Sequence, residues 1–161
     1  MMNHFTYDAP DEAATARLGA VLAEILPDGT TVALCGTLGA GKTRLVQAVA
    51  EAAGVRAGGV TSPTFVLIQE YRARRTVYHF DAYRIRDIDE FEELGPDEYF
   101  ESDALVLVEW ADRVENALPR ERIEVRIEVT GTQSRRFEII GLGPRYTSVV
   151  ELCRERLSGG V

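Results

Sequence analysis

Lysine is almost absent from this chain of 161 residues. Arginine supplies seventeen of the eighteen basic residues, and Lys42 is the only lysine. Cysteine is also scarce, since Cys35 and Cys153 are the only two. Two cysteines without metal-ligand spacing exclude a disulfide scaffold or a zinc-finger site, and they predict reduced, buried thiols in a cytoplasmic protein.

Long hydrophobic runs are missing as well. No apolar stretch approaches the roughly 20 residues that a membrane-spanning helix needs. The first fourteen residues contain neither a basic region nor an apolar core, so they do not resemble a signal peptide. We therefore expect a cytoplasmic protein without a membrane partner, and the length predicts one domain over 1–161.

The chain also has no excess of positive charge. The formal net charge is −8 at pH 7, which argues against a protein that grips nucleic acid through a broad basic face. It leaves a phosphate ligand possible, because salt screens distant carboxylates beyond about 8 Å and a local set of donors then dominates.

The hydrophobic pattern predicts an α/β fold, with a sheet of mixed direction flanked by helices. Helical spacing of apolar residues marks three segments, which are 11–26, 42–54 and 144–157. Short apolar or alternating runs predict strands at 31–35, two within 64–81, one within 103–110, and a hairpin of 122–129 with 135–141.

The segment GTLGAGKT matches the phosphate-loop (P-loop, Walker A) pattern G-x-x-x-x-G-K-[ST] between a predicted strand and a predicted helix. Glycines let successive backbone N–H groups converge on phosphate oxygens, and the helix adds its positive N-terminal end. Lys42 supplies a compact charge on a long stem, and the Thr43 hydroxyl suits Mg²⁺. The expected nucleotide contacts are Gly36, Thr37, Leu38, Gly39, Ala40, Gly41, Lys42 and Thr43.

Two acidic residues end apolar strands downstream of this loop. Glu109 closes ALVLVE in the manner of a Walker B strand, and Asp81 closes VYHFD. Ligands of open α/β sheets bind at the carboxyl ends of the strands. Glu109 is therefore a candidate Mg²⁺ ligand, or alternatively an edge acid in a salt bridge. Asp81 is a candidate either for holding a water molecule of the Mg²⁺ ion or for orienting the attacking water.

Other candidates are less specific. His79 is either part of the site or an ordinary core histidine, and Arg84 either pairs with Asp81 or contacts phosphate. Ser62-Pro63-Thr64 lies where switch loops sense the γ-phosphate in this architecture, although a Ser-Pro turn is common.

Four segments in this order, GTLGAGKT (36–43), TSPTF (61–65), YHFDAYR (78–84) and LVEW (107–110), resemble the bacterial TsaE (YjeE) family of P-loop ATPases. ELGPDEYF (93–100) also resembles the family. The likeness extends from the N-terminal helix through Trp110, and more loosely beyond. Thr37 departs from it, because many members carry an acid there; a nest of backbone amides should tolerate the change.

The resemblance implies a Mg²⁺-dependent ATP hydrolase that acts in biosynthesis of threonylcarbamoyladenosine in tRNA. It implies catalytic roles for Lys42, Asp81 and Glu109, a metal site at Thr43 and Glu109, and a mobile loop with Thr64 near the γ-phosphate. It also implies two partners, a threonylcarbamoyl-transferase catalytic subunit and its pseudo-enzyme partner (TsaD and TsaB types). The ATPase meets tRNA only indirectly, through this complex.

Two charged segments each have two possible roles, and two other functions are also compatible with the sequence. The arginines of 72–75 form either a solvated turn or a contact with a partner. Residues 87–103 carry nine acidic residues and no basic one. They form either a solvated surface or a docking surface for a basic partner. No arginine stands at an obvious finger position, which predicts slow hydrolysis without partners. A small-molecule kinase and a nucleotide sensor that does not hydrolyse ATP remain the alternatives.

Overall fold

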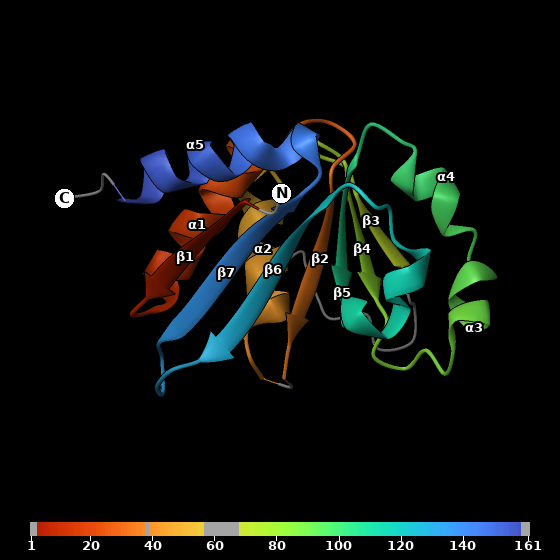
Figure 1. Ribbon diagram of the computed structural model, residues 1–161, viewed down its shortest axis with the longest axis horizontal. Coiled ribbons are helices and arrows are strands. Elements are labelled where there is room, and N and C mark those ends of the chain that lie inside the picture. The colour runs from red at the N-terminus through yellow and green to blue at the C-terminus, as the bar shows by residue number, and fades with distance from the viewer. Residues whose placement is uncertain (1–2, 38, 57–67, 159–161) are drawn as a thin grey trace.

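The computed structural model describes residues 3–37, 39–56 and 68–158. Its centre is a seven-stranded sheet with the order β1-β7-β6-β2-β5-β4-β3 (Figure 1). The strands are β1 (Asn3–Ala9), β2 (Thr31–Gly36), β3 (Ile68–Tyr71), β4 (Val77–Asp81), β5 (Leu105–Glu109), β6 (Arg122–Val129) and β7 (Arg135–Leu142).

The sheet has mixed direction, as the sequence predicts. Its central strands are parallel: β2 pairs with both β5 and β6, and β5 pairs with β4. The outer strands are antiparallel, with β6 on β7, β7 on β1 and β4 on β3. The parallel centre places the carboxyl ends of β2, β4 and β5 side by side, and these ends carry the proposed site.

Helices cover both faces of the sheet. The helices α1 (Glu12–Ile25), α2 (Lys42–Ala52) and α5 (Thr147–Ser158) pack on one face. The shorter α3 (Ile88–Glu92), α4 (Pro96–Phe100) and the 3₁₀ segment η1 (Ala111–Ala117) lie on the other face, at the end of the sheet formed by β3, β4 and β5 (Figure 1). A second 3₁₀ turn, η2 (Pro144–Tyr146), leads into α5.

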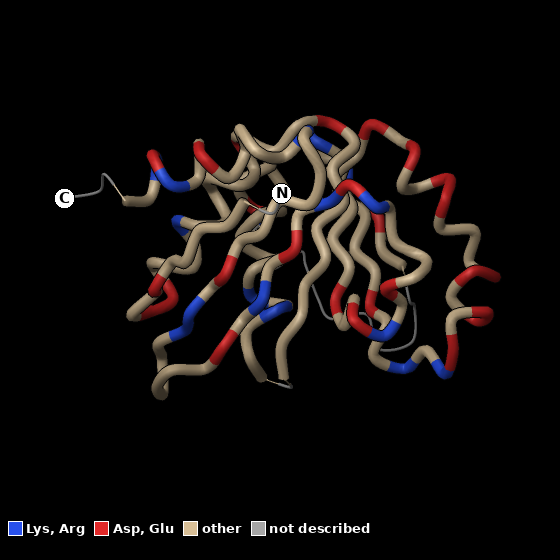
Figure 2. Tube along the Cα trace, in the orientation of Figure 1, with Lys and Arg blue, Asp and Glu red and all other residues tan. Residues whose placement is uncertain are grey.

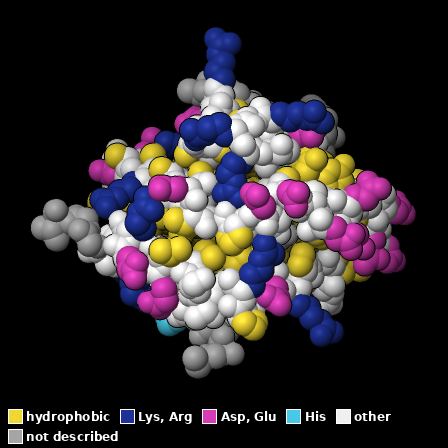
Figure 3. Space-filling view, turned by 90° about the horizontal axis from the view of Figure 1, so that it is seen from above, with side chains coloured by type: hydrophobic (Ala, Val, Ile, Leu, Met, Phe, Trp, Pro, Cys, Tyr) yellow, Lys and Arg dark blue, Asp and Glu magenta, His cyan; other side chains and the backbone are white. Residues whose placement is uncertain are grey.

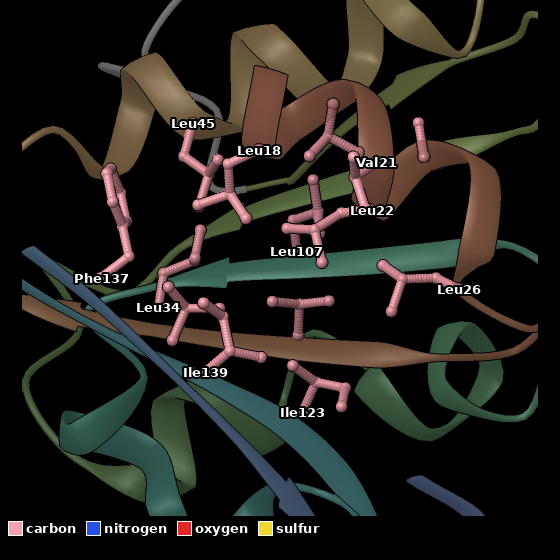
Figure 4. Packing of buried hydrophobic residues seen from close by; sticks show 14 of the residues in the cluster. Leu18, Val21, Leu22, Leu26, Leu34, Leu45, Leu107, Ile123, Phe137 and Ile139 are labelled. Carbon is pink, nitrogen blue, oxygen red and sulfur yellow. The ribbon is translucent and has the colours of Figure 1, made fainter. Parts of the chain in front are cut away.

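Strand β5 belongs to both hydrophobic cores, which explains why its sequence is a continuous apolar run. Leu105 and Leu107 face the larger core, whereas Val106 and Val108 face the smaller one. In the larger core, leucines of α1 lie over Leu107 (Figure 4). A strand that is buried on both faces needs apolar residues at every position, and it holds its terminal acid in a fixed place.

Strand β1 is not indicated by the hydrophobic pattern of the sequence. Its side chains alternate between half-buried and exposed, and only Ala9 is buried. The strand is held by its antiparallel pairing with β7 over its whole length, a long-range contact that its own weak apolar pattern does not reveal. The short helices α3 and α4 were likewise not predicted.

Strand β6 is less simple than its alternating sequence suggests. Its outward side chains Arg122 and Glu124 are buried, and an ion pair of 2.7 Å between them offsets the cost of burying the two charges. Arg122 also donates to the Pro119 carbonyl at 2.9 Å. From Arg126 onward the outward side chains are exposed and Ile127 is buried, but Val129 at the strand end is exposed as well.

The two charged segments of the sequence take different structural roles. Eight of the nine acids in 87–103 are exposed, and Figures 2 and 3 show them gathered at the end of the molecule that carries α3 and α4. In 72–75, Arg74 donates to the Ala52 carbonyl of α2, and Arg75 donates to the Ala23 carbonyl of α1 at 2.8 Å. These two arginines therefore stabilise helix ends.

Both cysteines are free thiols, as the sequence predicts. Burial raises the pKa of Cys35 to about 11 and that of Cys153 to about 12, so neither is a reactive thiolate at neutral pH. In the described part of the chain, no helix is both long and apolar enough to cross a membrane.

The contact between α1 and α2 provides a test of the packing. A methyl group added at Gly19 would lie 2.3 Å from Cβ of Ala48 and 2.8 Å from its carbonyl carbon. We expect Gly19→Ala to lower the free energy of unfolding by about 1–3 kcal/mol, although alanine favours helices, because the two helices must separate. Urea denaturation measures this effect. Ala20→Ser, at the exposed neighbour, should change stability by less than about 0.5 kcal/mol.

Candidate nucleotide-binding site

The phosphate loop connects the end of β2 to the first turn of α2. Gly39 and Gly41 have φ angles of 79° and 112°, in the region that favours glycine. Gly36 has a different reason to be glycine, because a Cβ there would lie 2.9 Å from the Ile127 carbonyl of β6. The loop thus needs glycine twice for its backbone conformation and once for close packing.

Lys42 is buried at the base of this loop. Its Nζ donates to the carbonyls of Gly36 at 2.7 Å and Thr37 at 2.8 Å, and it lies 3.8 Å from the centre of the Trp110 ring. Burial lowers the pKa of Lys42, an effect that the nearby Glu109 carboxylate opposes. These contacts hold the ammonium group in one position, although its stem is long and flexible.

The Glu109 carboxylate joins three elements. Its oxygens accept hydrogen bonds from the Thr43 hydroxyl at 2.8 and 3.0 Å, and one oxygen lies 2.5 Å from Nε2 of His79. Glu109 and His79 are both buried. Glu109 thus makes hydrogen bonds with Thr43 and His79, and it forms no salt bridge with a lysine or arginine of the described segments. His79 is buried in the core and at the same time contacts the candidate metal-binding carboxylate.

Asp81 ends β4 directly beside Glu109, its partner in the parallel register. Its Oδ1 accepts a hydrogen bond from the Tyr83 N–H at 2.9 Å. Partial burial raises the pKa of Asp81, the Tyr83 N–H opposes the shift, and the Glu109 charge adds to it. The predicted pair with Arg84 does not form: Arg84 is exposed and makes no ion pair within the described residues.

Trp110 has the only positive φ among the non-glycine residues that the structure describes, at 57°. A bulky residue in this region is strained, and such strain is concentrated at functional sites. One ring neighbour is Tyr83, with centroids 4.9 Å apart, and the Arg113 guanidinium lies 5.6 Å from the Trp110 centroid. The strained backbone directs the indole ring toward Lys42.

Two cavities meet at the phosphate loop. The smaller, of about 270 Å³, brings together the predicted residues of three separate segments: Gly39, Gly41, Lys42, Thr43, Asp81 and Glu109, with Arg44, Tyr83 and Trp110. The larger, of about 510 Å³, also touches Gly41 and Arg44. It extends between the start of α1 and the β6–β7 hairpin, where it is lined by Asp11, Glu12, Ala13, Thr15, Thr132, Gln133, Arg135 and Phe137.

The structure brings most of the predicted site residues together, but not all in the same role. Gly36 and Thr37 bind the Lys42 ammonium through their carbonyls and line neither of these cavities. Ala40 is completely buried. Leu38 and the predicted loop Ser62-Pro63-Thr64 lie outside the described residues. The larger cavity and the stacking of Tyr83 and Arg113 on Trp110 are not evident from the sequence. Tyr83 belongs to the YHFDAYR motif, but Arg113 and most residues of the larger cavity belong to no motif and come from distant parts of the chain.

The residues at Thr43 and Glu109 fit a magnesium ion that is held with a nucleotide. Mg²⁺ typically binds one or two carboxylates and completes its shell with phosphate oxygens and water. One carboxylate beside one hydroxyl supplies that kind of donor set. Among the described residues, no three His, Cys, Asp or Glu side chains form a cage that would hold a metal by protein ligands alone.

The contact between Lys42 and Trp110 can be tested without any ligand. Trp110 is the only tryptophan, so its fluorescence reports this contact directly. We expect Lys42→Ala to shift the emission to longer wavelength, because removal of the side chain opens one ring face to water. Arg72→Ala, whose side chain is 82% exposed and lies outside this cavity, should leave the spectrum unchanged. Identical spectra for wild type and Lys42→Ala would contradict the stacking.

Comparison with known proteins agrees with this geometry. The family described as "Threonylcarbamoyl adenosine biosynthesis protein TsaE" matches residues 9–137. A protein of Bacillus subtilis (strain 168) with the name "tRNA threonylcarbamoyladenosine biosynthesis protein TsaE" is 39% identical over 147 residues, which cover 91% of this chain and 89% of the relative. A Haemophilus influenzae protein of the same name is 38% identical and covers 86% and 90%.

A solved structure shows the same fold. The crystal structure of Bacillus subtilis YdiB superposes with a TM-score of 0.79 and 31% sequence identity, over 100% of this chain and 99% of that one. The match therefore includes the outer strands and α5 as well as the phosphate loop. Family match, sequence identity and fold agree, and the chain belongs to the TsaE family.

Proposed function

We propose that this protein is a Mg²⁺-dependent ATPase that supports threonylcarbamoyl transfer in the biosynthesis of threonylcarbamoyladenosine in tRNA. The observation that supports the proposal most is the smaller cavity, where Lys42, Thr43, Asp81 and Glu109 converge from three elements. This set combines a cation that can face the phosphates, a pair of ligands for a metal ion and a second carboxylate. Nucleotide hydrolysis needs these parts. Membership of the TsaE family supplies the pathway.

The two cavities suggest how ATP lies. The phosphates enter the smaller cavity, where the N–H groups of Gly39 to Thr43 and the N-terminus of α2 favour negative charge. The base and ribose then extend past Gly41 into the larger cavity, between the start of α1 and the hairpin residues Thr132 and Gln133. Exposed Asp11 and Glu12 offer acceptors there for the donors of a base or a ribose.

Each side chain has a distinct task in hydrolysis. Lys42 neutralises charge on the β- and γ-phosphates, and Thr43 with Glu109 holds Mg²⁺. The ion, when bound, withdraws charge from the phosphate oxygens. Asp81 lies next to Glu109 and orients the attacking water. Burial raises its pKa, which makes its carboxylate a better proton acceptor than a fully solvated one.

His79 sets the orientation of the metal-binding carboxylate. Its Nε2 lies 2.5 Å from Glu109, and its Nδ1 has no hydrogen-bond partner among the described residues. When Nε2 donates its proton to Glu109, one carboxylate oxygen is fixed and the other stays on Thr43. Partners of this kind orient metal ligands in many sites.

We further propose slow hydrolysis by the protein alone and activation by its partners, the transferase catalytic subunit and the pseudo-enzyme of TsaD and TsaB type. Arg113 is exposed and stacks at the aromatic pair of Tyr83 and Trp110 rather than at the phosphate loop. An arginine that enters the site from a partner typically accelerates P-loop hydrolysis by about 10³–10⁵. The net charge of −8 supports contact with tRNA through the complex and not through this chain.

Substitutions in the smaller cavity test hydrolysis. We expect Lys42→Ala and Glu109→Gln each to reduce ATP turnover by at least about a hundredfold, because each removes charge or metal binding that the transition state needs. Asp81→Asn should reduce turnover while ATP binding persists. Phosphate release and calorimetric binding measure the two effects. Arg72→Ala, whose side chain is 82% exposed and distant from the loop, is the control.

The same assays separate the alternatives. A kinase would transfer the γ-phosphate to a nucleoside or nucleotide acceptor, which can be followed with labelled ATP. A sensor would bind ATP in wild type and release no phosphate.

Partner activation needs a separate measurement. We expect the wild-type turnover of ATP to rise by at least about tenfold when the transferase catalytic subunit, its pseudo-enzyme partner and tRNA are added. Lys42→Ala should bind the same partners and show no increase. If the isolated protein hydrolyses ATP rapidly and added partners do not change the rate, the activation hypothesis is wrong.

A further inference from the structure

Arg135, the first residue of β7, connects the phosphate loop to a distant part of the chain. Its Nε donates to the carbonyl of Ala40 at 2.9 Å. The two residues are 95 positions apart in the sequence. No motif covers this contact, and the hydrolysis mechanism does not use it.

The same guanidinium also closes the hairpin between β6 and β7. One terminal nitrogen donates to the carbonyls of Gly131 at 3.1 Å and Ser134 at 2.8 Å. The Thr130 N–H also donates to the Ser134 carbonyl, at 3.1 Å. Arg135 thus holds the loop and the hairpin with one rigid, planar group.

The contact with Ala40 controls the direction of a phosphate donor. The peptide group between Ala40 and Gly41 is planar and trans, so its carbonyl and its N–H point in opposite directions. A carbonyl that is held toward Arg135 therefore directs the Gly41 N–H away from it. Gly41 has a φ of 112° and would otherwise have wide conformational freedom, so this N–H needs an external restraint.

Arg135 also brings a positive charge that no acid neutralises. Its three hydrogen bonds go to carbonyl oxygens, and within the described residues it takes part in no ion pair. Arg136, the next residue, points to the opposite face of the sheet and forms an exposed pair with Asp8 at 2.9 Å. Two adjacent arginines therefore have different surroundings.

Arg135 lines the larger cavity together with Gly41 and the hairpin residues Thr132 and Gln133. An occupant of this cavity contacts the hairpin that Arg135 anchors. The hairpin, Arg135 and the Ala40–Gly41 peptide form one continuous chain of contacts from the larger cavity to the phosphate nest.

We propose that Arg135 is a positioning residue that orients the Gly41 N–H for phosphate and couples the larger cavity to the phosphate loop. The inference rests on the proposed function, because the shared occupant of both cavities is a nucleotide. Binding of the nucleoside portion stabilises the hairpin, the hairpin stabilises Arg135, and Arg135 stabilises the loop in its phosphate-binding form. Nucleoside and phosphate therefore increase each other's affinity.

Three variants of the full chain test this by isothermal titration calorimetry. Arg135→Met removes the donors and the charge. We expect it to bind ADP about tenfold more weakly, because one charge-assisted hydrogen bond is lost. Arg135→Lys keeps the charge, but its compact ammonium cannot span both Ala40 and the hairpin. Arg136→Met is the matched control and should bind ADP within about twofold of wild type. Thermal unfolding shows whether each variant is folded.

The coupling itself is measured with the two halves of the ligand, adenosine and inorganic pyrophosphate. In wild type, saturating adenosine should raise the affinity for pyrophosphate by at least about threefold. Arg135→Lys should bind pyrophosphate nearly as wild type does and show no such increase. Arg135→Met should lose both affinity and coupling. A purely structural role would reduce stability and leave the coupling unchanged.

The outcomes separate this inference from the proposed function. If wild type binds neither ADP nor pyrophosphate, the proposed function fails and this inference fails with it. If wild type binds ADP, and a folded Arg135→Met or Arg135→Lys shows the wild-type coupling, only the role of Arg135 is overturned. Independent binding of adenosine and pyrophosphate to wild type would also overturn it.

Discussion

The buried carboxylate of Glu109 is the contact on which the rest of the site depends. It holds the Thr43 hydroxyl of α2 on one side and His79 of β4 on the other. Buried polar groups of this kind are costly unless they are hydrogen-bonded, so the three elements have one favourable arrangement. This arrangement fixes the start of α2 relative to the sheet, and the phosphate loop is the segment between them.

The positions of the other site residues follow from this contact. Asp81 is the register partner of Glu109 on β4, so its place is set once β4 and β5 pair. Trp110 follows Glu109 with a strained backbone, and its ring covers Lys42. Both neighbours of Lys42 have positive φ angles: Gly41, which precedes it in the chain, and Trp110, whose ring lies 3.8 Å from its Nζ. A rigid sheet edge thus supports a loop that needs unusual backbone conformations.

Besides ion pairs and stacking, arginine in this chain donates hydrogen bonds to backbone carbonyls in two kinds of place. Arg74 and Arg75 donate to carbonyls at the C-terminal ends of helices, where a positive charge is favourable. Arg135 donates to the carbonyl of Ala40 within the phosphate loop. A guanidinium suits both because it offers several donors in a fixed plane, whereas the single lysine has the one position where a compact charge is needed.

The sequence by itself determined the phosphate loop, the strands β2 to β7, the helices α1, α2 and α5, and the acids at the ends of β4 and β5. Each depends on local order: glycine spacing, apolar periodicity, or an acid after an apolar run. The tertiary structure decided the rest. Strand β1 forms because β7 offers a long pairing edge. His79 contacts Glu109 because β4 pairs with β5, although its own register partner is Leu107. The cavity at the hairpin and the contact of Arg135 with Ala40 arise between residues about a hundred positions apart, so only the folded chain brings them together.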